Sequence, residues 1–342
     1  MNASPLVETV HAAPADAAAH PGTAVMEAVG IDTGFGDVRV LDNVSIRVDS
    51  GEIVGLIGES GSGKTTLGRL LMKMLEPAAG DVLFRGRSLA DLQRSDLKAF
   101  RRKVQMVFQN PYGSLHPLRK IGAALEEVFE IHDIGDRRER RRRAIELLEG
   151  VGLSAADADK YPAEFSGGQR QRIAIARAIA LGPELVIADE PVSALDVSVQ
   201  AQILNLLKDL NAAEGLAVLF ISHDLSVVQY LCDRVLVMYL GTIVESGDAE
   251  QVLSRPVHPY TVALRQSAPS IANAGRTAPI VPAIDGEIPG VARRPSGCPF
   301  HARCRRRMAV ADGDRCVRER PVLKPVPGGG AAACHFPDAP DA

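Results

Sequence analysis

The chain contains no tryptophan, only 4% aromatic residues and no strong excess of charge of either sign. Its formal net charge of -3 gives no global reason to expect nucleic-acid binding. No apolar run approaches the roughly 18 residues that a membrane-spanning helix needs. The N-terminus also lacks the basic start and apolar run of a signal peptide. These absences predict a cytosolic protein that reaches a membrane only by docking onto another protein.

The composition divides the 342 residues into three parts. Residues 1–24 are rich in Ala, Pro and small polar residues and have no amphipathic period, which predicts a disordered tail. From about residue 255 onward Pro, Gly, Cys and Arg dominate and periodicity is weak, so residues 256–342 are interpreted as an irregular C-terminal extension. Residues 25–255 are expected to form the main domain.

Within that domain, apolar strands alternate with amphipathic helices, which favours an α/β fold with a mainly parallel sheet. Residues 111–165 look largely helical and include the basic run Arg137–Arg143, which we interpret as a solvated helix face. The remaining expected elements are a β-rich stretch over 38–48, strands over 52–57, 185–188 and 216–221, and helices over 65–75, 171–180 and 199–210.

A glycine-rich segment follows the first of these buried strands and opens a helix. Its sequence is Gly58-Glu59-Ser60-Gly61-Ser62-Gly63-Lys64-Thr65-Thr66. Glycines let successive backbone N–H groups point at phosphate oxygens, and the helix N-terminus adds its positive dipole end. Lys64 supplies a charge for the β- and γ-phosphates and the Thr65 hydroxyl can bind Mg²⁺. A chance glycine-rich turn is the alternative, which the preceding strand and following helix disfavour.

Polar residues follow three further strands. Asp189 and Glu190 end the strand over 185–188, where Asp189 can hold Mg²⁺ and Glu190 can accept a proton from an attacking water. A solvated turn is the alternative reading of this acidic pair. Gln109 follows the apolar residues 104–108, and His223 follows the strand over 216–221. Alone, such a histidine would be interpreted as a surface or capping residue.

The segment Phe165-Ser166-Gly167-Gly168-Gln169 stands between the phosphate loop and the acidic pair. With this order of motifs, the chain resembles the ATP-binding cassette (ABC) ATPases. The resemblance implies a RecA-like phosphate-loop core with an antiparallel β subdomain and a helical signature subdomain at about 111–168. It also implies ATP and Mg²⁺, with Gln109 contacting Mg²⁺ and water, and His223 touching the γ-phosphate.

Two further residues take roles from this resemblance. Asp196, in Ser193-Ala194-Leu195-Asp196, resembles the loop that crosses between two cassettes. Phe35 is the candidate for the aromatic residue that stacks on adenine, although Phe35 reads equally as a core residue.

Members of the family work as pairs. Ser166, Gly167, Gly168 and Gln169 open a helix and form a second anion-binding site, which the resemblance assigns to the nucleotide of the opposite cassette. Because one cassette is present, a second ATPase subunit is expected, either a copy or a paralogue.

Three segments resemble the dipeptide and oligopeptide importer branch, specifically its second ATPase subunit. They are residues 109–117, residues 161–202, and His258-Pro259-Tyr260-Thr261 with the tail that follows. This implies two transmembrane permease subunits, an indirect link to an extracytoplasmic solute-binding protein, and a place at the cytoplasmic face of the inner membrane. Nickel complexes, glutathione or another small solute are the alternative cargoes. A soluble ABC ATPase acting on DNA or ribosomes is the alternative of another class, disfavoured by the single cassette; a non-hydrolysing regulator is disfavoured by Glu190 and His223.

Four of the five cysteines lie near the C-terminus, at Cys298, Cys304, Cys316 and Cys334. Disulfides are disfavoured in the cytosol, and four thiolates can hold zinc or an iron–sulfur cluster. The spacing lacks paired Cys-x-x-Cys units, so four unliganded thiols are the alternative. Resemblance to the peptide-importer branch adds a [4Fe–4S] cluster to the expectations. The fifth, Cys232, is flanked by apolar residues and is predicted to be a packed thiol.

Overall fold

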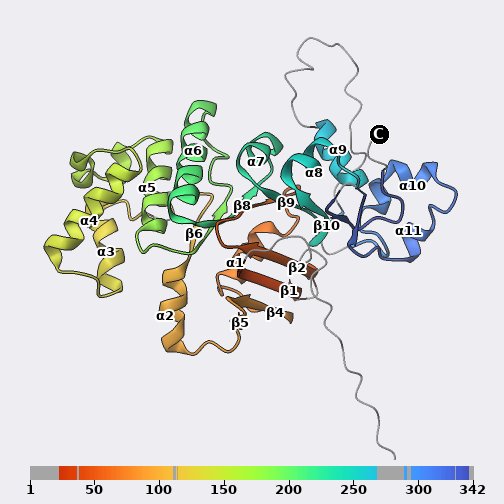
Figure 1. Cartoon of the computed structure of the whole chain (residues 1–342), viewed down its shortest axis with the longest axis horizontal. Coiled ribbons are helices and arrows are strands. Elements are labelled where there is room, and N and C mark those ends of the chain that lie inside the picture. The colour runs from red at the N-terminus through yellow and green to blue at the C-terminus, as the bar shows by residue number, and fades with distance from the viewer. Residues whose placement is uncertain are drawn as a thin grey trace, which may run out of the picture.

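The computed structural model describes residues 23–36, 38–110, 113, 115–267, 289–290, 294–327 and 329–338. Of the expected N-terminal tail, residues 1–22 lie outside the described residues, as do Pro111, Tyr112 and Ser114 of the importer-like segment. Figure 1 shows a central body of sheets and helices between a helical part (α3–α5) and a C-terminal part (α10 and α11).

The larger sheet has the strand order β11-β12-β10-β9-β3-β8-β7-β6. The five strands from β9 to β6 are parallel, while β10, β12 and β11 add an antiparallel edge. The α/β fold with a mainly parallel sheet is therefore confirmed. The strands are β3 (Ile53–Ile57), β6 (Val104–Val107), β7 (Leu185–Asp189), β8 (Ala217–Ser222), β9 (Arg234–Tyr239), β10 (Thr242–Asp248), β11 (Lys324–Pro325) and β12 (Ala331–Ala332).

A second, four-stranded sheet is antiparallel, with the order β2-β1-β4-β5. Its strands are β1 (Ala24–Phe35), β2 (Val38–Asp49), β4 (Ala79–Phe84) and β5 (Arg87–Ser88). Alternate residues of β2, such as Val44, Ile46 and Val48, are fully buried. Their side chains belong to a core shared with α1 and with strands of the larger sheet.

Eleven α-helices occur in the described part of the chain. They are α1 (Lys64–Leu71), α2 (Arg94–Lys103), α3 (Ile121–Ile131), α4 (Arg137–Gly150), α5 (Gly167–Ile179), α6 (Val197–Glu214), α7 (Leu225–Leu231), α8 (Ala249–Ser254), α9 (Pro259–Ser267), α10 (Arg305–Ala309) and α11 (Arg315–Arg318). The helix expected to run to residue 75 is wrong at its end. Helix α1 stops at Leu71, and Lys73 adopts the left-handed conformation with φ of 50°.

The parallel strands are apolar throughout because both of their faces are covered. In β3, Ile53 and Ile57 pack into a core with α5–α9, whereas Val54 and Leu56 pack into a second core with α1 and the antiparallel sheet. The prediction that Cys232 is a packed thiol is confirmed, since it lies in the first core and is 9% exposed.

Helices α3, α4 and α5 form a third core with Leu115 and the turn near Ala158. In the basic run at the start of α4, Arg137, Arg138 and Arg142 are exposed, and other arginines of the run are half-buried and paired with carboxylates. Arg143 contacts Glu139 at 2.6 Å and Arg141 contacts Glu126 at 3.2 Å. These ion pairs agree with a solvated helix face.

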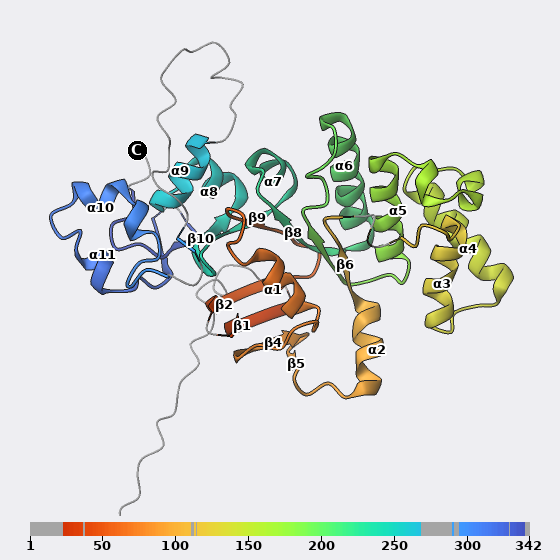
Figure 2. The same ribbon diagram turned by 180° about the vertical axis from the view of Figure 1, so that it is seen from behind.

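The C-terminal extension packs onto the larger sheet, and the view from behind places α10 and α11 far from α3 and α4 (Figure 2). Strand β12 pairs with β10, and Phe300 joins the core under α9. The sequence predicts an irregular extension. Its described residues lie mostly outside regular elements and include the helices α9–α11 and two strands of two residues each, elements mostly too short to leave a periodic signal in the sequence.

Candidate functional site

The glycine-rich segment connects the end of β3 to the start of α1, as the sequence predicts. Gly61 has φ of 77° and Gly63 has φ of 107°, conformations in which a side chain would be strained. A Cβ on Gly63 would also lie 2.8 Å from the Leu41 side chain. The glycines therefore allow a tight loop whose N–H groups lead into a helix N-terminus, the arrangement that binds phosphate.

Lys64 is the first residue of α1 and is only 5% exposed. Its Nζ donates to the backbone oxygens of Gly58 at 2.7 Å and Glu59 at 3.0 Å. Burial lowers the pKa of Lys64, while the carboxylates of Glu190, Asp189 and Glu59 oppose that change. The ammonium group thus lies inside the loop, where a polyphosphate would place its negative charge.

Thr65, in the first turn of α1, lies beside Asp189, the last residue of β7. The Thr65 hydroxyl donates to the Asp189 carboxylate at 3.3 Å. Burial raises the pKa of Asp189, and the neighbouring Glu190 carboxylate raises it further. A hydroxyl and a buried carboxylate beside a phosphate loop are the ligand types that Mg²⁺ binds in nucleotide sites.

Glu190 lies between the side chains of Gln109, which follows β6, and His223, which follows β8. Its Oε2 accepts a hydrogen bond of 2.9 Å from the Gln109 side-chain amide, and its Oε1 lies 3.3 Å from His223 Nδ1. Glu190 also has φ of 46°, which is unusual for a residue other than glycine. A positive φ at a residue other than glycine costs free energy. Such strained residues are concentrated at active sites, where the surrounding structure holds them in position.

The loop and these polar residues surround one open cavity of about 600 Å³. It is lined by Val40, Ser60, Gly61, Ser62, Gly63, Lys64, Thr65, Thr66, Gln109, Glu190 and His223. The anion-binding loop, the buried ammonium and the Thr–Asp pair fit a nucleoside triphosphate with Mg²⁺. Val40 was missed by the sequence analysis, because an apolar residue in a strand gives no signal of ligand contact.

Several predicted residues are not among those lining the cavity. Phe35, the candidate adenine contact, ends β1 and is 58% exposed, so it is not a core residue. Ser166, Gly167, Gly168 and Gln169 begin α5, where Ser166 Oγ accepts the Gln169 N–H at 3.3 Å and Gln169 Oε1 accepts the Ser166 N–H at 3.0 Å. Asp196 precedes α6 and is exposed. Ser166, Gly167 and Gln169 are exposed as well.

The C-terminal cysteines gather in one region as free thiols. Burial raises the pKa of Cys298 to about 12 and that of Cys334 to about 12, and the neighbouring thiols add to both effects. The pKa values of Cys304 and Cys316 are also raised, chiefly by burial. Among the described residues, however, no group of three or more His, Cys, Asp or Glu side chains is arranged to hold a metal ion.

Among the helices of the described residues, none is both long enough and apolar enough to cross a membrane.

Two family models match the chain. The ABC transporter model matches residues 41–193, and the model for the oligopeptide/dipeptide transporter C-terminal region matches residues 244–310. A probable peptide ABC transporter ATP-binding protein of Sinorhizobium fredii is 50% identical over 91% of this chain and 86% of its own length. The dipeptide transport ATP-binding protein DppF of Escherichia coli is 47% identical over 88% of each chain. The oligopeptide transport protein AppF of Bacillus subtilis is 44% identical over 88% of this chain and 90% of its own.

Solved structures with a similar fold are ABC cassettes. The cbiO1 protein of Clostridium perfringens, part of an ABC transporter complex, superposes with a TM-score of 0.63 at 25% identity, over 68% of this chain and 91% of its own. The ATP-binding cassette MJ0796, in a dimeric structure with ADP and phosphate, superposes with a TM-score of 0.59 at 32% identity. That alignment covers 66% of this chain and 98% of the cassette.

Proposed function

This chain belongs to the ABC transporter family, and from that premise we propose that it is the ATP-hydrolysing subunit of a peptide importer. One observation carries the proposal. The same cavity is lined by Lys64, Gln109, Glu190 and His223, and beside it Asp189 accepts a hydrogen bond from the Thr65 hydroxyl. The groups of this chain that would bind phosphate and Mg²⁺ and accept a proton therefore lie in one place. The match of residues 244–310 to the peptide-transporter C-terminal region supports peptides as the cargo.

We propose the following role for each residue. The loop N–H groups and Lys64 bind the phosphates, and Thr65, Asp189 and Gln109 are the proposed Mg²⁺ ligands. Bound Mg²⁺ neutralises charge on the β- and γ-phosphates. Glu190 accepts a proton as water attacks the γ-phosphorus; the bond to the bridging oxygen breaks, and ADP and phosphate leave. His223 holds Glu190 from the other side and is placed to contact the γ-phosphate.

A second cassette, either a copy or a paralogue, would complete the site. Ser166, Gly167 and Gln169 are exposed at the start of α5, beside the buried Gly168, and the exposed Asp196 precedes α6. These groups do not line their own chain's cavity, and we propose that they contact the γ-phosphate bound to a partner cassette. ATP would then join two cassettes and hydrolysis would separate them.

The proposed contact with two membrane permease subunits lies beside Gln109. A cavity of about 730 Å³ opens there, and Phe108, Gln109, Asn110, Ile131 and Arg177 are among its lining residues. Phe108 and Ile131 are exposed apolar side chains, at 39% and 58%. Because Gln109 also contacts Glu190, a permease segment in this cavity would be coupled to hydrolysis. We propose that the chain works at the cytoplasmic face of the inner membrane, linked to a solute-binding protein only through the permeases.

We further propose residues 25–255 as the cassette, with its helical part at about 111–168, and 256–342 as the peptide-transporter extension. The [4Fe–4S] cluster stays a prediction for Cys298, Cys304, Cys316 and Cys334. Its support is the match of residues 244–310 to the peptide-transporter C-terminal region, whereas the described side chains are not arranged to hold a metal ion. Anaerobic purification followed by iron and sulfide assays tests it, and a colourless protein without iron would contradict it.

The importer proposal is tested by affinity purification of the tagged chain from detergent-solubilised membranes. Recovery of two multi-spanning proteins and a related ATPase is expected. Recovery of ribosomal or DNA-bound proteins without any membrane protein would contradict the importer and leave only ATP hydrolysis.

A further inference from the structure

The C-terminal extension reaches the phosphate loop through Glu59, the second residue of the loop. The Glu59 backbone N–H donates to the Tyr260 hydroxyl at 2.9 Å. The Glu59 carboxylate accepts two hydrogen bonds from the Arg303 guanidinium, Nη1 to Oε2 at 2.9 Å and Nη2 to Oε1 at 3.2 Å. Such a paired contact fixes the carboxylate in position and orientation more strictly than a single bond.

The residues that hold Glu59 are themselves fixed by burial. Tyr260 is fully buried, and the Arg303 side chain is 7% exposed. Tyr260 packs against Tyr239 and Phe300 with ring centroids 4.6 and 5.4 Å away. Arg303 also donates to the Tyr239 hydroxyl at 3.3 Å. A buried guanidinium is costly unless its charge is balanced, so removal of the Glu59 carboxylate would leave an unfavourable charge.

The backbone carbonyl of Glu59 contacts residues that line the nucleotide site. Its backbone oxygen accepts from Lys64 Nζ at 3.0 Å and from the Ser62 N–H at 3.2 Å. The side chain and N–H of one residue are therefore held by the extension, while its carbonyl organises the loop. Small displacements of phosphate-binding groups weaken their interactions sharply, because those interactions depend on alignment.

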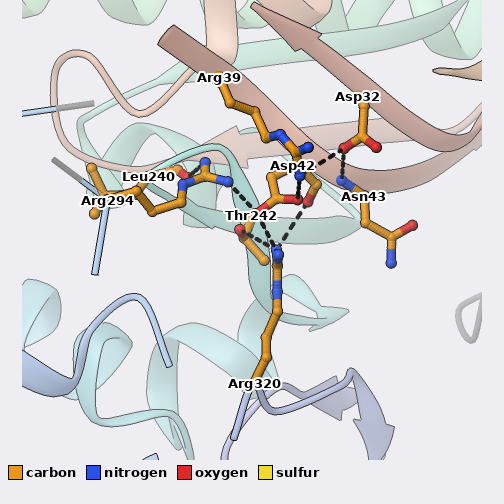
Figure 3. Close-up of polar contacts among 8 residues, drawn as sticks. All are labelled: Asp32, Arg39, Asp42, Asn43, Leu240, Thr242, Arg294 and Arg320. Atoms are coloured by element: carbon orange, nitrogen blue, oxygen red, sulfur yellow. Dashed lines mark hydrogen bonds and ion pairs between the residues drawn. The ribbon is translucent and has the colours of Figure 1, made fainter. Parts of the chain in front are cut away.

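A second connection runs through the turn between β9 and β10 (Figure 3). Arg294, from the extension, donates to the Leu240 backbone oxygen and to Asp42. The adjoining Gly241 N–H donates to the Ser62 backbone oxygen at 2.7 Å. The extension thus contacts the phosphate loop directly at Glu59. It also supports the β9–β10 turn, which in turn contacts the loop at Ser62.

We propose that Tyr260 and Arg303 are positioning residues of the nucleotide site, which makes the C-terminal extension part of the ATP-binding machinery. The inference rests on the proposed ATPase function. It requires that loss of either contact weakens binding of the nucleotide phosphates more than it affects the overall fold.

The test uses the full-length chain and calorimetric titration with ADP and Mg²⁺, which avoids hydrolysis during the measurement. Tyr260→Phe removes only the hydroxyl and leaves the ring packing. We expect it to raise the Kd about fivefold, within the range for loss of one hydrogen bond. Arg303→Met is expected to raise the Kd about tenfold or more, and Arg303→Lys to give an intermediate value because it restores charge without the paired geometry. Arg307→Met is the control, since Arg307 pairs with Asp314 inside the extension.

Thermal unfolding without nucleotide separates positioning from folding. Tyr260→Phe should unfold within a few degrees of the unaltered chain while its Kd rises, and KM for ATP should rise more than kcat falls. The Kd of the double variant Glu59→Gln/Arg303→Met should rise less than expected from adding the effects of Glu59→Gln and Arg303→Met. Each single substitution already removes the contact between the two side chains. Equal Kd values for Tyr260→Phe, Arg303→Met and the unaltered chain would overturn the inference and leave the ATPase proposal intact. Failure of the unaltered chain to bind ADP and Mg²⁺ would overturn both.

Discussion

The side-chain amide of Gln109 donates a 2.9 Å hydrogen bond to the carboxylate of Glu190, across a sequence separation of 81 residues. His223 lies 3.3 Å from the other oxygen of the same carboxylate. These two contacts orient the proposed base. One of its two partners, Gln109, also borders the cavity proposed for the permease. The contact gives a direct physical route by which a membrane partner would influence hydrolysis.

Glu190→Gln should abolish most ATP turnover while ATP binding is retained. The amide keeps the shape of the side chain but does not accept a proton, so a loss of about 10²- to 10⁴-fold is expected. ATP should then hold the cassette pair together. Phosphate release gives the turnover, and size-exclusion chromatography with ATP and Mg²⁺, with the second cassette present, gives the pairing.

Glu214→Gln is the matched control, because Glu214 is an exposed carboxylate at the end of α6. It should leave both measurements unchanged. Turnover near the unaltered rate in Glu190→Gln would remove Glu190 from the proposed mechanism.

The two signature glycines should respond differently to alanine. A Cβ on Gly168 would lie 2.2 Å from Val199 Cγ1, so α5 and α6 must shift apart or Val199 must rotate. We expect Gly168→Ala to lower the free energy of unfolding by about 1–3 kcal/mol. On Gly167 the nearest atom to a Cβ is Leu195 Cδ2 at 3.6 Å, an ordinary contact, so Gly167→Ala should fold normally.

Gly167→Ala then isolates the proposed contact with a partner. It should reduce ATP-dependent pairing, measured by size-exclusion chromatography, without lowering the midpoint of denaturant unfolding. Normal pairing and turnover in Gly167→Ala would argue against a role for this helix start at a cassette interface.

Apart from Val40, the cavity residues could be predicted from the sequence because they follow parallel strands, at an edge of the sheet that the fold must create. Asp189, Glu190 and His223 follow parallel strands, and carboxyl ends of parallel strands meet at one edge of a sheet. The pairing of strands β6 to β9 then follows from alternating strands and helices. Local patterns were sufficient here because the chemistry lies at element ends.

The extension could not be predicted in the same way. The contact of Arg303 with Glu59 joins residues 244 positions apart, and no local pattern encodes it. Strands β11 and β12 have two residues each, below the length at which alternation is visible. The sequence indicates Tyr260 only as part of a family-like segment. In the structure its hydroxyl accepts a hydrogen bond from the Glu59 N–H of the phosphate loop. A signal was present in that segment: an aromatic residue with a polar tip is rarely buried without a hydrogen-bond partner.

Phe35→Ala should raise KM for ATP several-fold while the protein keeps its stability. The side chain is 58% exposed at the end of β1, so its removal forfeits little buried area. If the ring stacks on adenine, Phe35→Trp should restore affinity because stacking requires only an aromatic face. Nucleotide titration and thermal unfolding measure the two effects. Equal KM values in Phe35→Ala and the unaltered chain would remove Phe35 from the site.

Asp42 joins the antiparallel sheet to the extension, and its charge should contribute to stability at neutral pH. Its carboxylate is 6% exposed and accepts from Arg39 at 2.9 Å as well as from Arg294 and Arg320 (Figure 3). Asp42→Asn removes the negative charge and leaves the arginines without it. Loss of hydrogen bonds to a charged group predicts a decrease of about 1.5–3 kcal/mol in the free energy of unfolding at pH 7.

The pH dependence follows from the direction of the pKa change. Burial tends to raise the pKa of Asp42, but Arg320 and Arg294 together hold it below the ordinary 3.8. A carboxyl with a lowered folded-state pKa contributes stability above its unfolded pKa and loses it as pH falls through the folded value. Denaturant unfolding from pH 7 to pH 3 should therefore show a constant difference between the unaltered chain and Asp42→Asn down to about pH 5, and a shrinking one below about pH 4. Asp312→Asn, at an exposed ion pair 3.7 Å from Arg318, should show little difference at any pH. A difference for Asp42→Asn that stays constant to pH 3 would mean that the ion pairs with Arg294 and Arg320 do not lower the pKa of Asp42 in the folded protein.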